Sequence, residues 1–444
     1  MTRRTLLQWL DHQQSIHPRS VELGLDRVGA VWQRMGAPRP APVVITVGGT
    51  NGKGSTVAFL EAMLTADGKR VGSYTSPHLL RYNERVRVMG EEAGDAALVD
   101  AFERIDAARG ATATDAIALT YFEFGTLAAL WIFAQSKLDV AVLEVGLGGR
   151  LDAVNIIDAD AAVVTTIDLD HQDWLGNDRD SIGREKAGIF RAARPAVIGT
   201  RAPPAGLLVE ARRIGAEVIR VGIEYDFSSH AAGWRWQYGK VAVDLPAPAL
   251  LAPCQIDNAA AAIAALYTLR DRLGWNPAAL VAAVGSARLP ARLQRLHKPG
   301  AADLIVDVAH NPQAAGVLGE WLRQNPVRGR TLAVFGALAD KDVAGIVAPL
   351  MAHIGQWFLG GLDADTPRGL PVQALRARMR AAAPGAGIEV HTGIAAALYA
   401  AAAQADVRDR VLAFGSFFVA ATALQWARCN GWIEAEPAHP VSKV

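Results

Sequence analysis

The sequence has few cysteines, almost no net charge and no long apolar run. Its two cysteines, Cys254 and Cys429, lie far apart without metal-ligand spacing, which argues against a disulfide framework or zinc knuckle and fits a reducing cytoplasm. The formal net charge of +1 gives no reason to expect nucleic acid or an anionic membrane as a partner. No run reaches the roughly 18 apolar residues that a membrane-spanning helix needs. Gln8 and Asp11 interrupt the N-terminal apolar stretch, so no signal peptide is predicted.

The clearest functional motif is a strand, a glycine-rich turn and a helix near residue 50. Residues 43–47 predict a buried parallel strand, and residues 55–67 predict a helix ended by glycine. The turn between them, Gly48-Gly49-Thr50-Asn51-Gly52-Lys53-Gly54-Ser55, would surround phosphate oxygens with backbone N–H groups, and Ser55 or Thr56 would place a hydroxyl on Mg²⁺. Its glycine and lysine spacing departs from the standard phosphate loop. The flanking strand and helix favour a phosphate loop over a plain glycine-rich turn.

Polar residues end two further predicted strands. Glu144 closes the strand of residues 138–145, and His171 follows the strand of residues 161–167. Parallel sheets place their ligand sites at the carboxyl ends of the strands, so Glu144 is expected to support Mg²⁺ and His171 to ligate a metal. A salt-bridged glutamate and a structural histidine are the alternatives. Local sequence alone makes Lys186 an ordinary surface lysine and Asn258 an N-cap.

A loop and a helix between these strands also carry polar and aromatic residues. Residues 76–85 mix proline, histidine, tyrosine and two arginines between predicted strands, so they form either a loop that holds an aromatic or anionic ligand or a solvated loop. The apolar helix of residues 120–131 contains Glu123, which is either a functional or a paired structural carboxylate.

The predicted fold is α/β with two domains. A P-loop ATPase-like parallel-sheet domain is expected over residues 1–295, and a smaller Rossmann-like α/β domain over residues 296–444. Strands at 304–308, 331–335 and 411–414 each end in glycine or polar residues, and Asp307 and His310 lie at the first of these ends.

Seven motifs in order resemble the bacterial folylpolyglutamate synthase and dihydrofolate synthase family, within the Mur ligase superfamily. They cover nearly the whole chain and are Gly49 to Ser55, Ser76 to Arg85, Glu144 to Asp152, His171 to Gly176, Glu185 to Ile189, Asp307 to Pro312 and Gly336 to Asp342. The resemblance implies ATP- and Mg²⁺-dependent ligation of L-glutamate to dihydropteroate and to the terminal glutamate of folates, through an acyl phosphate. It implies a cytoplasmic monomer that binds neither nucleic acid nor membrane. The two domains would be a Mur ligase central-type domain and a glutamate-ligase domain.

The resemblance also implies roles for individual residues. Lys53, Lys186 and His310 would be catalytic. The residues expected to bind ATP are Gly49, Thr50, Asn51, Gly52, Lys53, Gly54, Ser55, Asn258, Arg292 and Asp307. The expected metal ligands are Ser55, Glu144, His171 and a carbamylated Lys186. The residues expected near the folate are Ser76, Pro77, His78, Arg81, Tyr82, Arg85, Phe122 and Asp152.

Three positions depart from the family pattern, and three other functions remain possible. Ala291 stands where the family often has glycine, so the backbone of that turn is expected to differ; Cys254 replaces a histidine, and Phe418 replaces a smaller or polar residue. These differences concern substrate preference and not the reaction class. The alternatives are a peptidoglycan-precursor ligase, a small-molecule kinase and a nucleotide-dependent switch. The first carries a whole domain ahead of the loop, which about 40 residues cannot supply.

Overall fold

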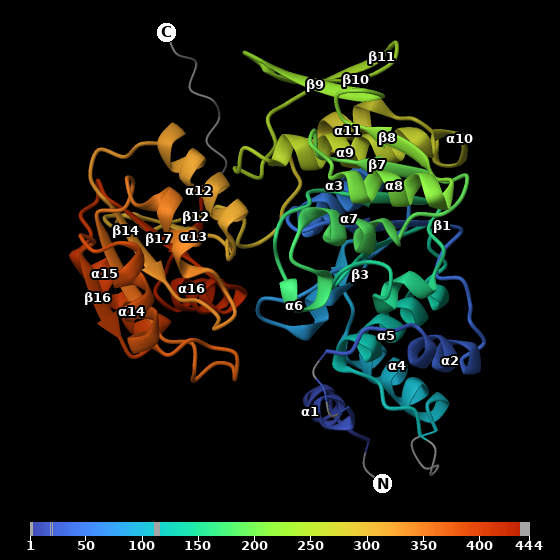
Figure 1. Cartoon of the computed structure of the whole chain (residues 1–444), viewed down its shortest axis with the longest axis horizontal. Coiled ribbons are helices and arrows are strands. Elements are labelled where there is room, and N and C mark those ends of the chain that lie inside the picture. Colours follow the sequence, from blue (N-terminus) through green and yellow to red (C-terminus); the bar gives the residue numbers. More distant parts are fainter. Residues whose placement is uncertain (1–2, 18, 20, 111–115, 436–444) are drawn as a thin grey trace. The chain divides into compact units, whose positions relative to one another are not determined.

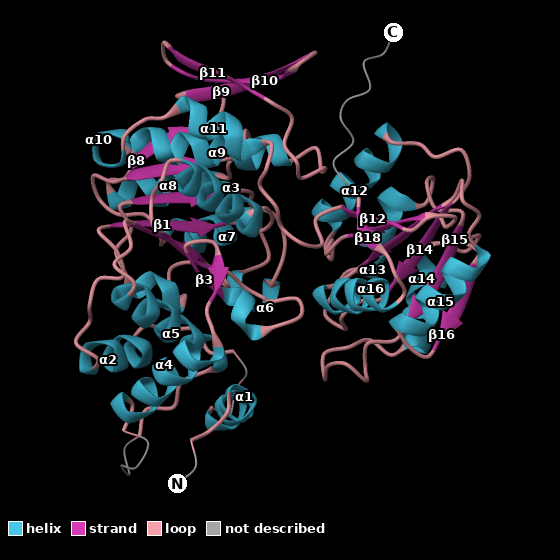
Figure 2. Ribbon diagram, turned by 180° about the vertical axis from the view of Figure 1, so that it is seen from behind, coloured by secondary structure: helices cyan, strands magenta, loops and turns pink. Residues whose placement is uncertain are grey.

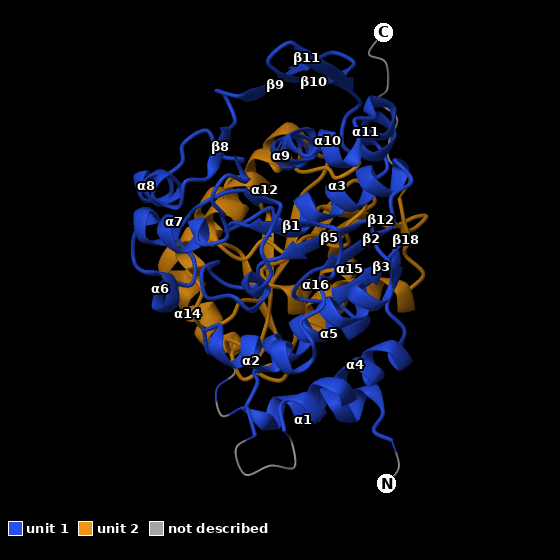
Figure 3. Ribbon diagram, turned by 90° about the vertical axis from the view of Figure 1, so that its right-hand side faces the viewer, with its two compact units in different colours: residues 1–248, 256–287 blue, residues 249–255, 288–444 orange. Residues whose placement is uncertain are grey.

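The structure, a computed structural model, describes residues 3–17, 19, 21–110 and 116–435 and divides into two compact units (Figure 3). Unit 1 consists of Met1–Pro248 and Ile256–Ala287, and unit 2 of Ala249–Gln255 and Arg288–Val444. Within the described residues, no helix has both the length and the apolar character that crossing a bilayer requires.

Unit 1 is built on an eight-stranded sheet in the order β4-β3-β2-β5-β1-β6-β7-β8 (Figure 1). Its strands are β1 (Val43–Gly48), β2 (Val71–Tyr74), β3 (Val86–Val88), β4 (Glu91–Glu92), β5 (Val140–Glu144), β6 (Ala161–Val164), β7 (Pro195–Ile198) and β8 (Glu217–Arg220). The six strands from β2 to β8 in this order are parallel, which confirms the predicted parallel sheet. β1 lies between β5 and β6, so the carboxyl ends of these three strands are neighbours.

Helices cover this sheet, and a small separate sheet lies beside two of them (Figure 2). The helices are α1 (Leu6–Ile16), α2 (Asp26–Arg34), α3 (Lys53–Ala66), η1 (Tyr82–Arg85), α4 (Asp95–Ala108), α5 (Tyr121–Gln135), η2 (Ala153–Ile156), α6 (Gln172–Leu175), α7 (Arg179–Ala187), α8 (Ala205–Ile214), α9 (Gln255–Thr268), α10 (Arg270–Leu273) and α11 (Pro277–Val284). The small antiparallel sheet contains β9 (Tyr225–His230), β10 (Gly233–Tyr238) and β11 (Val241–Leu245). The Trp236 indole N–H donates to the Ala260 carbonyl at 3.2 Å and so ties β10 to α9.

The first turns of α5 and α9 show the surroundings of Glu123 and Asn258, for which the sequence allowed a structural role. Thr120 is the N-cap of α5. The Glu123 carboxylate accepts the Thr120 N–H at 2.7 Å and forms an ion pair with Arg27 at 3.1 Å. Glu123 is therefore a paired structural carboxylate. The N-cap prediction for Asn258 is wrong, because α9 already begins at Gln255 and Asn258 lies in its first turn.

Unit 2 contains a seven-stranded sheet in the order β16-β15-β14-β17-β13-β12-β18. Its strands are β12 (Gln294–His297), β13 (Asp303–Val306), β14 (Thr331–Phe335), β15 (Gln356–Gly360), β16 (Ile388–His391), β17 (Arg410–Phe414) and β18 (Ile433–Glu434). Its helices are α12 (Pro312–Gln324), α13 (Val343–Val347), η3 (Ala348–Leu350), α14 (Val372–Ala382), α15 (Ile394–Gln404) and α16 (Phe417–Cys429). The five strands from β16 to β13 are parallel, while β12 and β18 are antiparallel additions at one edge. This α/β architecture confirms the predicted fold class.

Candidate active site

The turn between β1 and α3 has backbone geometry that excludes side chains at two glycines. Gly49 and Gly52 have φ angles of +143° and +87°, which L-residues rarely adopt. A Cβ on Gly49 would overlap the Thr165 hydroxyl, and one on Gly52 would overlap the side-chain oxygen of Asn258. Glycine at these two positions therefore lets Thr165 and Asn258 pack directly against the backbone of the turn.

Two lysines converge on the same carbonyl of this turn. Lys53 Nζ donates to the carbonyl oxygens of Gly49 and Thr50, both at 3.2 Å, and Lys186 Nζ donates to Gly49 O at 3.0 Å. Lys53 is also the first residue of α3, whose N-terminus carries partial positive charge. Lys53 and the helix N-terminus thus place positive charge at the turn.

Residues after β6, which the sequence analysis did not select, fix the conformation of the turn. Thr166 accepts the Asn51 N–H through its hydroxyl at 3.0 Å and the Thr50 N–H through its carbonyl at 2.7 Å. The Thr165 hydroxyl donates to Asn51 O at 2.6 Å, and the Asp168 N–H donates to the Thr50 hydroxyl at 3.0 Å. The signal in the sequence was the polar run Thr165-Thr166-Ile167-Asp168 after an apolar strand.

Lys186 is not the surface lysine that local sequence suggests. It lies in the last turn of α7 and is only 4% exposed. Burial, with the nearby charge of Lys53, lowers its pKa to about 7, although Asp170 and Asp152 act in the opposite direction. In a large fraction of the molecules, the Lys186 side chain is therefore a neutral amine at neutral pH.

Asp152 is a second buried titratable group of this site. Its carboxylate accepts the N–H groups of Leu147 at 2.8 Å and Val154 at 3.0 Å. Burial raises its pKa to about 6, while these backbone hydrogen bonds and the charge of Lys53 oppose the rise. Asp152, Lys53 and Lys186 therefore influence one another electrostatically.

Glu144 and His171 occupy the two predicted strand ends. Glu144 lies opposite Val47 of β1, is 5% exposed, and accepts the Ser76 N–H at 3.1 Å. His171 is exposed, adopts a left-handed φ of 52° and immediately precedes α6. The described residues contain no cluster of three or more histidine, cysteine, aspartate or glutamate side chains able to hold a metal. Of the expected magnesium ligands, only Glu144 and His171 are of these residue types. The remaining ligands would have to come from Ser55, a modified Lys186 and phosphate.

The loop of residues 76–85 is organised from within. Both carboxylate oxygens of Glu84 accept backbone N–H groups, from Leu79 at 2.6 Å and from Leu80 and Arg81 at 2.7 Å each. Tyr82 and Arg85 are 4% and 8% exposed. The loop is therefore a folded element and not a solvated connection.

The predicted folate-binding residues do not all gather at one point. Phe122 packs against Gly146, whose added Cβ would meet its ring, and its ring centre lies 6.0 Å from that of Tyr74. Arg81, by contrast, is 65% exposed and faces Glu92 and Asp95 at 3.8 and 3.9 Å. The structure thus brings Phe122 beside the glycine-rich segment that leads to Asp152, and leaves Arg81 at the surface.

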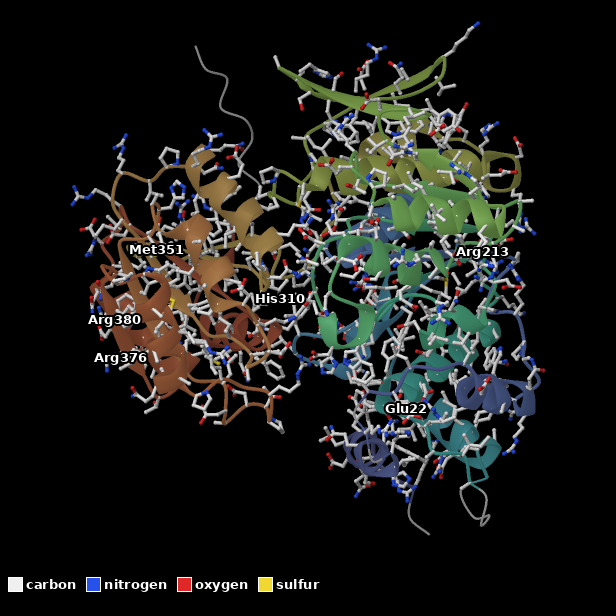
Figure 4. All side chains as sticks on the ribbon, in the orientation of Figure 1. Glu22, Arg213, His310, Met351, Arg376 and Arg380 are labelled. Carbon is white, nitrogen blue, oxygen red and sulfur yellow. The ribbon has the colours of Figure 1, made fainter. Side chains whose placement is uncertain are left out.

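In unit 2, the predicted residues gather where β13 and β17 end. Asp307 accepts the N–H groups of Leu293 and Ala309, both at 2.7 Å, and burial raises its pKa against the opposing charge of Arg292. The Arg292 guanidinium lies 5.4 Å from the centre of the Phe417 ring, and the His310 ring lies 6.2 Å from it. His310, labelled in Figure 4, belongs to the segment that joins β13 to α12.

Ala291 keeps a turn that glycine would favour. Its φ is 54°, in the left-handed region that glycine adopts more readily than alanine, and a difference from the backbone of the family stays a prediction. Phe417, the first residue of α16, touches both Arg292 and His310 and was not selected from the sequence.

Comparisons with known proteins define the class first. The Mur ligase middle domain model matches residues 47–266, and the Mur ligase glutamate ligase domain model matches residues 291–417. The fold and the glycine-rich site thus define a Mur ligase.

Individual relatives narrow this class. The chain is 44% identical to the Escherichia coli dihydrofolate synthase/folylpolyglutamate synthase over 95% of both chains. It is 40% identical to the Haemophilus influenzae protein of the same name, over 94% of this chain and 96% of that one. The chain belongs to the dihydrofolate synthase/folylpolyglutamate synthase family.

Solved structures agree with this assignment. A structure of E. coli FolC in complex with DHPP and ADP has a TM-score of 0.88 and 43% identity, covering 96% of this chain and 99% of that chain. A bifunctional folylpolyglutamate synthase/dihydrofolate synthase with Mn, AMPPNP and L-glutamate bound has a TM-score of 0.86 and 42% identity, covering 96% and 98%.

Proposed function

We propose that this protein is an ATP-dependent ligase that joins L-glutamate to dihydropteroate, forming dihydrofolate, and to the terminal glutamate of folates. The near-full-length match to enzymes named for both reactions carries the proposal. The site fits the chemistry, since a carboxylate resists attack by an amine until it is phosphorylated and Lys53 stands at a turn built for phosphate.

The turn between β1 and α3 holds the ATP phosphates in this mechanism. Gly49 and Gly52 let Thr165 and Asn258 pack against the turn, and residues 52–55 supply N–H groups, the Lys53 charge and the Ser55 hydroxyl. Ser55, Glu144, His171 and a carbamylated Lys186 would hold Mg²⁺, which offsets negative charge on the transferring phosphoryl group. Asn258, beside Gly52, helps to position the nucleotide.

The acceptor lies along the loop of residues 76–85 and the segment from Phe122 to Asp152. The half-buried ring of Phe122 provides a stacking surface for the pterin or aminobenzoate, while the buried ring of Tyr82 supports the loop. The expected roles of Arg292 and Asp307 in binding ATP and of His310 in catalysis stay predictions. The division into an ATP-binding domain (1–295) and a glutamate-ligase domain (296–444) stays a prediction, as do the monomeric state and the cytoplasmic location.

The test of this function is ADP release by the purified protein with ATP, Mg²⁺ and L-glutamate. One reaction receives dihydropteroate and another receives tetrahydrofolate. Release that requires both glutamate and a pterin supports the ligase, and product mass identifies dihydrofolate or the diglutamate. Release that does not need glutamate would instead indicate a kinase, and absence of turnover with either pterin would favour a nucleotide-dependent switch.

Gly52→Ala is expected to raise the KM for ATP roughly 10-fold, because the new Cβ displaces Asn258 and strains a left-handed backbone. Steady-state ADP release over a range of ATP concentrations measures this effect. Gly68→Ala is the matched control, since Gly68 also has a positive φ of 75° but open space around its Cβ position. It should cost stability in a thermal melt and leave the KM unchanged. An equal rise in KM for both variants would mean that backbone strain, and not the contact with Asn258, is responsible.

A further inference from the structure

Arg85 is a buried cation with no carboxylate partner among the described residues. Its Nε donates to His78 Nδ1 at 2.8 Å, and its guanidinium carbon lies 5.4 and 5.5 Å from the ring centres of Tyr82 and Tyr121. The flanking Arg87, in contrast, pairs with Glu61 at 3.1 Å. A buried charge without a counter-ion is costly, so this position favours an anionic ligand.

The groups around Arg85 do not neutralise it. Glu84, its neighbour in the chain, already uses both carboxylate oxygens on three backbone N–H groups. Burial and the Arg85 charge lower the pKa of His78 to about 4, so the imidazole is neutral at neutral pH. Burial raises the pKa values of Tyr82 and Tyr121, which therefore remain uncharged phenols. Arg85 thus carries one positive charge that these neighbours do not compensate.

This charge is separate from the one at the phosphate turn. Lys186 experiences the charges of Lys53, Asp170 and Asp152, whereas Arg85 acts on His78, Tyr82 and Tyr121. Tyr74 experiences the charges of both Arg85 and Asp152, so it lies within reach of both groups. The structure therefore has two separate cationic positions, Lys53 at the phosphate turn and Arg85 in the loop of residues 76–85.

The two proposed acceptors differ in this second carboxylate. Dihydropteroate has a single carboxylate, which is the one that reacts. A folate that ends in glutamate reacts at its γ-carboxylate and keeps a free α-carboxylate. We propose that Arg85 binds the α-carboxylate of the terminal glutamate, so that it is a specificity-determining residue that contributes more to binding of folate acceptors than to binding of dihydropteroate. This assignment rests on the proposed function and deepens it.

Arg85→Gln tests the assignment by equilibrium binding and by kinetics. The variant should bind tetrahydrofolate roughly 10- to 100-fold more weakly, because a hydrogen-bonded charge pair is lost, and should lose much less affinity for dihydropteroate, which lacks this carboxylate. The KM values for the two acceptors should follow the same pattern. Arg87→Gln is the control, since it removes a neighbouring arginine that has its own carboxylate partner, and thermal melts establish that both variants fold.

A tetrahydrofolate analogue with an α-carboxamide provides the complementary change on the ligand. The wild type should prefer the carboxylate over the amide by the same 10- to 100-fold, and Arg85→Gln should show no preference. Equal losses for dihydropteroate and tetrahydrofolate, or a preference that persists in the variant, would overturn the assignment and make Arg85 a support of the loop. A wild-type protein that binds dihydropteroate but not tetrahydrofolate would also overturn it while leaving dihydrofolate synthesis standing. If the wild type binds neither pterin, the proposed function fails and the assignment falls with it.

Discussion

Lys53→Ala is expected to lower kcat/KM for ATP by about 10³-fold in glutamate-dependent ADP release. Lys53 is the first residue of α3 and reaches back over the turn to the carbonyls of Gly49 and Thr50. Its charge therefore lies where the terminal phosphates of ATP would be held, and no other side chain of the turn residues 49–55 carries a positive charge. The measurement is initial rates of ADP release at varied ATP, with dihydropteroate and L-glutamate saturating.

Lys69→Ala is the control for this variant. Lys69 follows the same helix and pairs with Asp67 at 3.5 Å, away from the turn. Its removal should leave kcat/KM within about 2-fold, as for a surface ion pair. If Lys53→Ala folds normally and retains wild-type kcat/KM, the turn is not the phosphate site, and the ATP-dependent mechanism must be placed elsewhere.

The strand, turn and helix around this lysine were predictable because their signals are local. An apolar run, clustered glycines and a helix pattern follow one another within 25 residues, and the structure places β1, the turn and α3 there. The helix begins at Lys53, two residues before the predicted start, because Gly52 with its positive φ is its N-cap. The parallel character of the sheet follows in the same way from apolar strands that alternate with helices, whereas its strand order was not predicted.

The environment of Lys186 could not be predicted from its own sequence, because it depends on distant segments. Arg184-Glu185-Lys186 reads as a solvated helix end, yet α7 packs closely on Gly149, where an added Cβ would lie 2.8 Å from the Glu185 carbonyl oxygen. This close approach, set by a residue far away in sequence, buries Lys186 beside the phosphate turn. Only the resemblance to the family selected Lys186 in advance.

The same limit applies to residues that act through backbone contacts. Thr165 and Thr166 hold the turn by hydrogen bonds to residues more than 100 positions earlier. The contact of Asn258 with Gly52 likewise depends on how α9 packs beside the turn. Local patterns locate the strands and the turn, whereas tertiary packing decides which polar residues support them.

Activity is expected to depend on carbon dioxide, because the neutral amine of Lys186 can form a carbamate. In this reaction the Nζ lone pair attacks the carbon of CO₂, an N–C bond forms, one C=O electron pair moves to oxygen, and the nitrogen loses a proton to solvent. The pKa of about 7 leaves much of Lys186 unprotonated at neutral pH, as this step requires. The remaining N–H can still donate to Gly49 O, so the modification is compatible with the observed contact.

The expected result is a carbamate resonance in ¹³C NMR after incubation with labelled bicarbonate, absent from Lys186→Ala. Raising the pH from about 6 to about 8 should increase its occupancy at constant dissolved CO₂, because the neutral fraction rises as the pH passes through the Lys186 pKa. Removal of CO₂ should lower the rate of ADP release, and bicarbonate should restore it. Lys186→Ala should lose about 10³-fold in kcat, because a ligand expected to carry negative charge near Mg²⁺ disappears.

Lys240→Ala, at an exposed hairpin turn, is the control and should keep the CO₂ dependence of the wild type. Acetate should partly restore Lys186→Ala if a carboxylate is the group that the site requires, whereas methylamine should restore it if the site requires an amine. Full activity in CO₂-free buffer, without a carbamate resonance, would show that Lys186 acts as an unmodified lysine. In that case its lowered pKa would serve to limit the positive charge beside Lys53, and Glu144 and His171 would have to hold the metal without it.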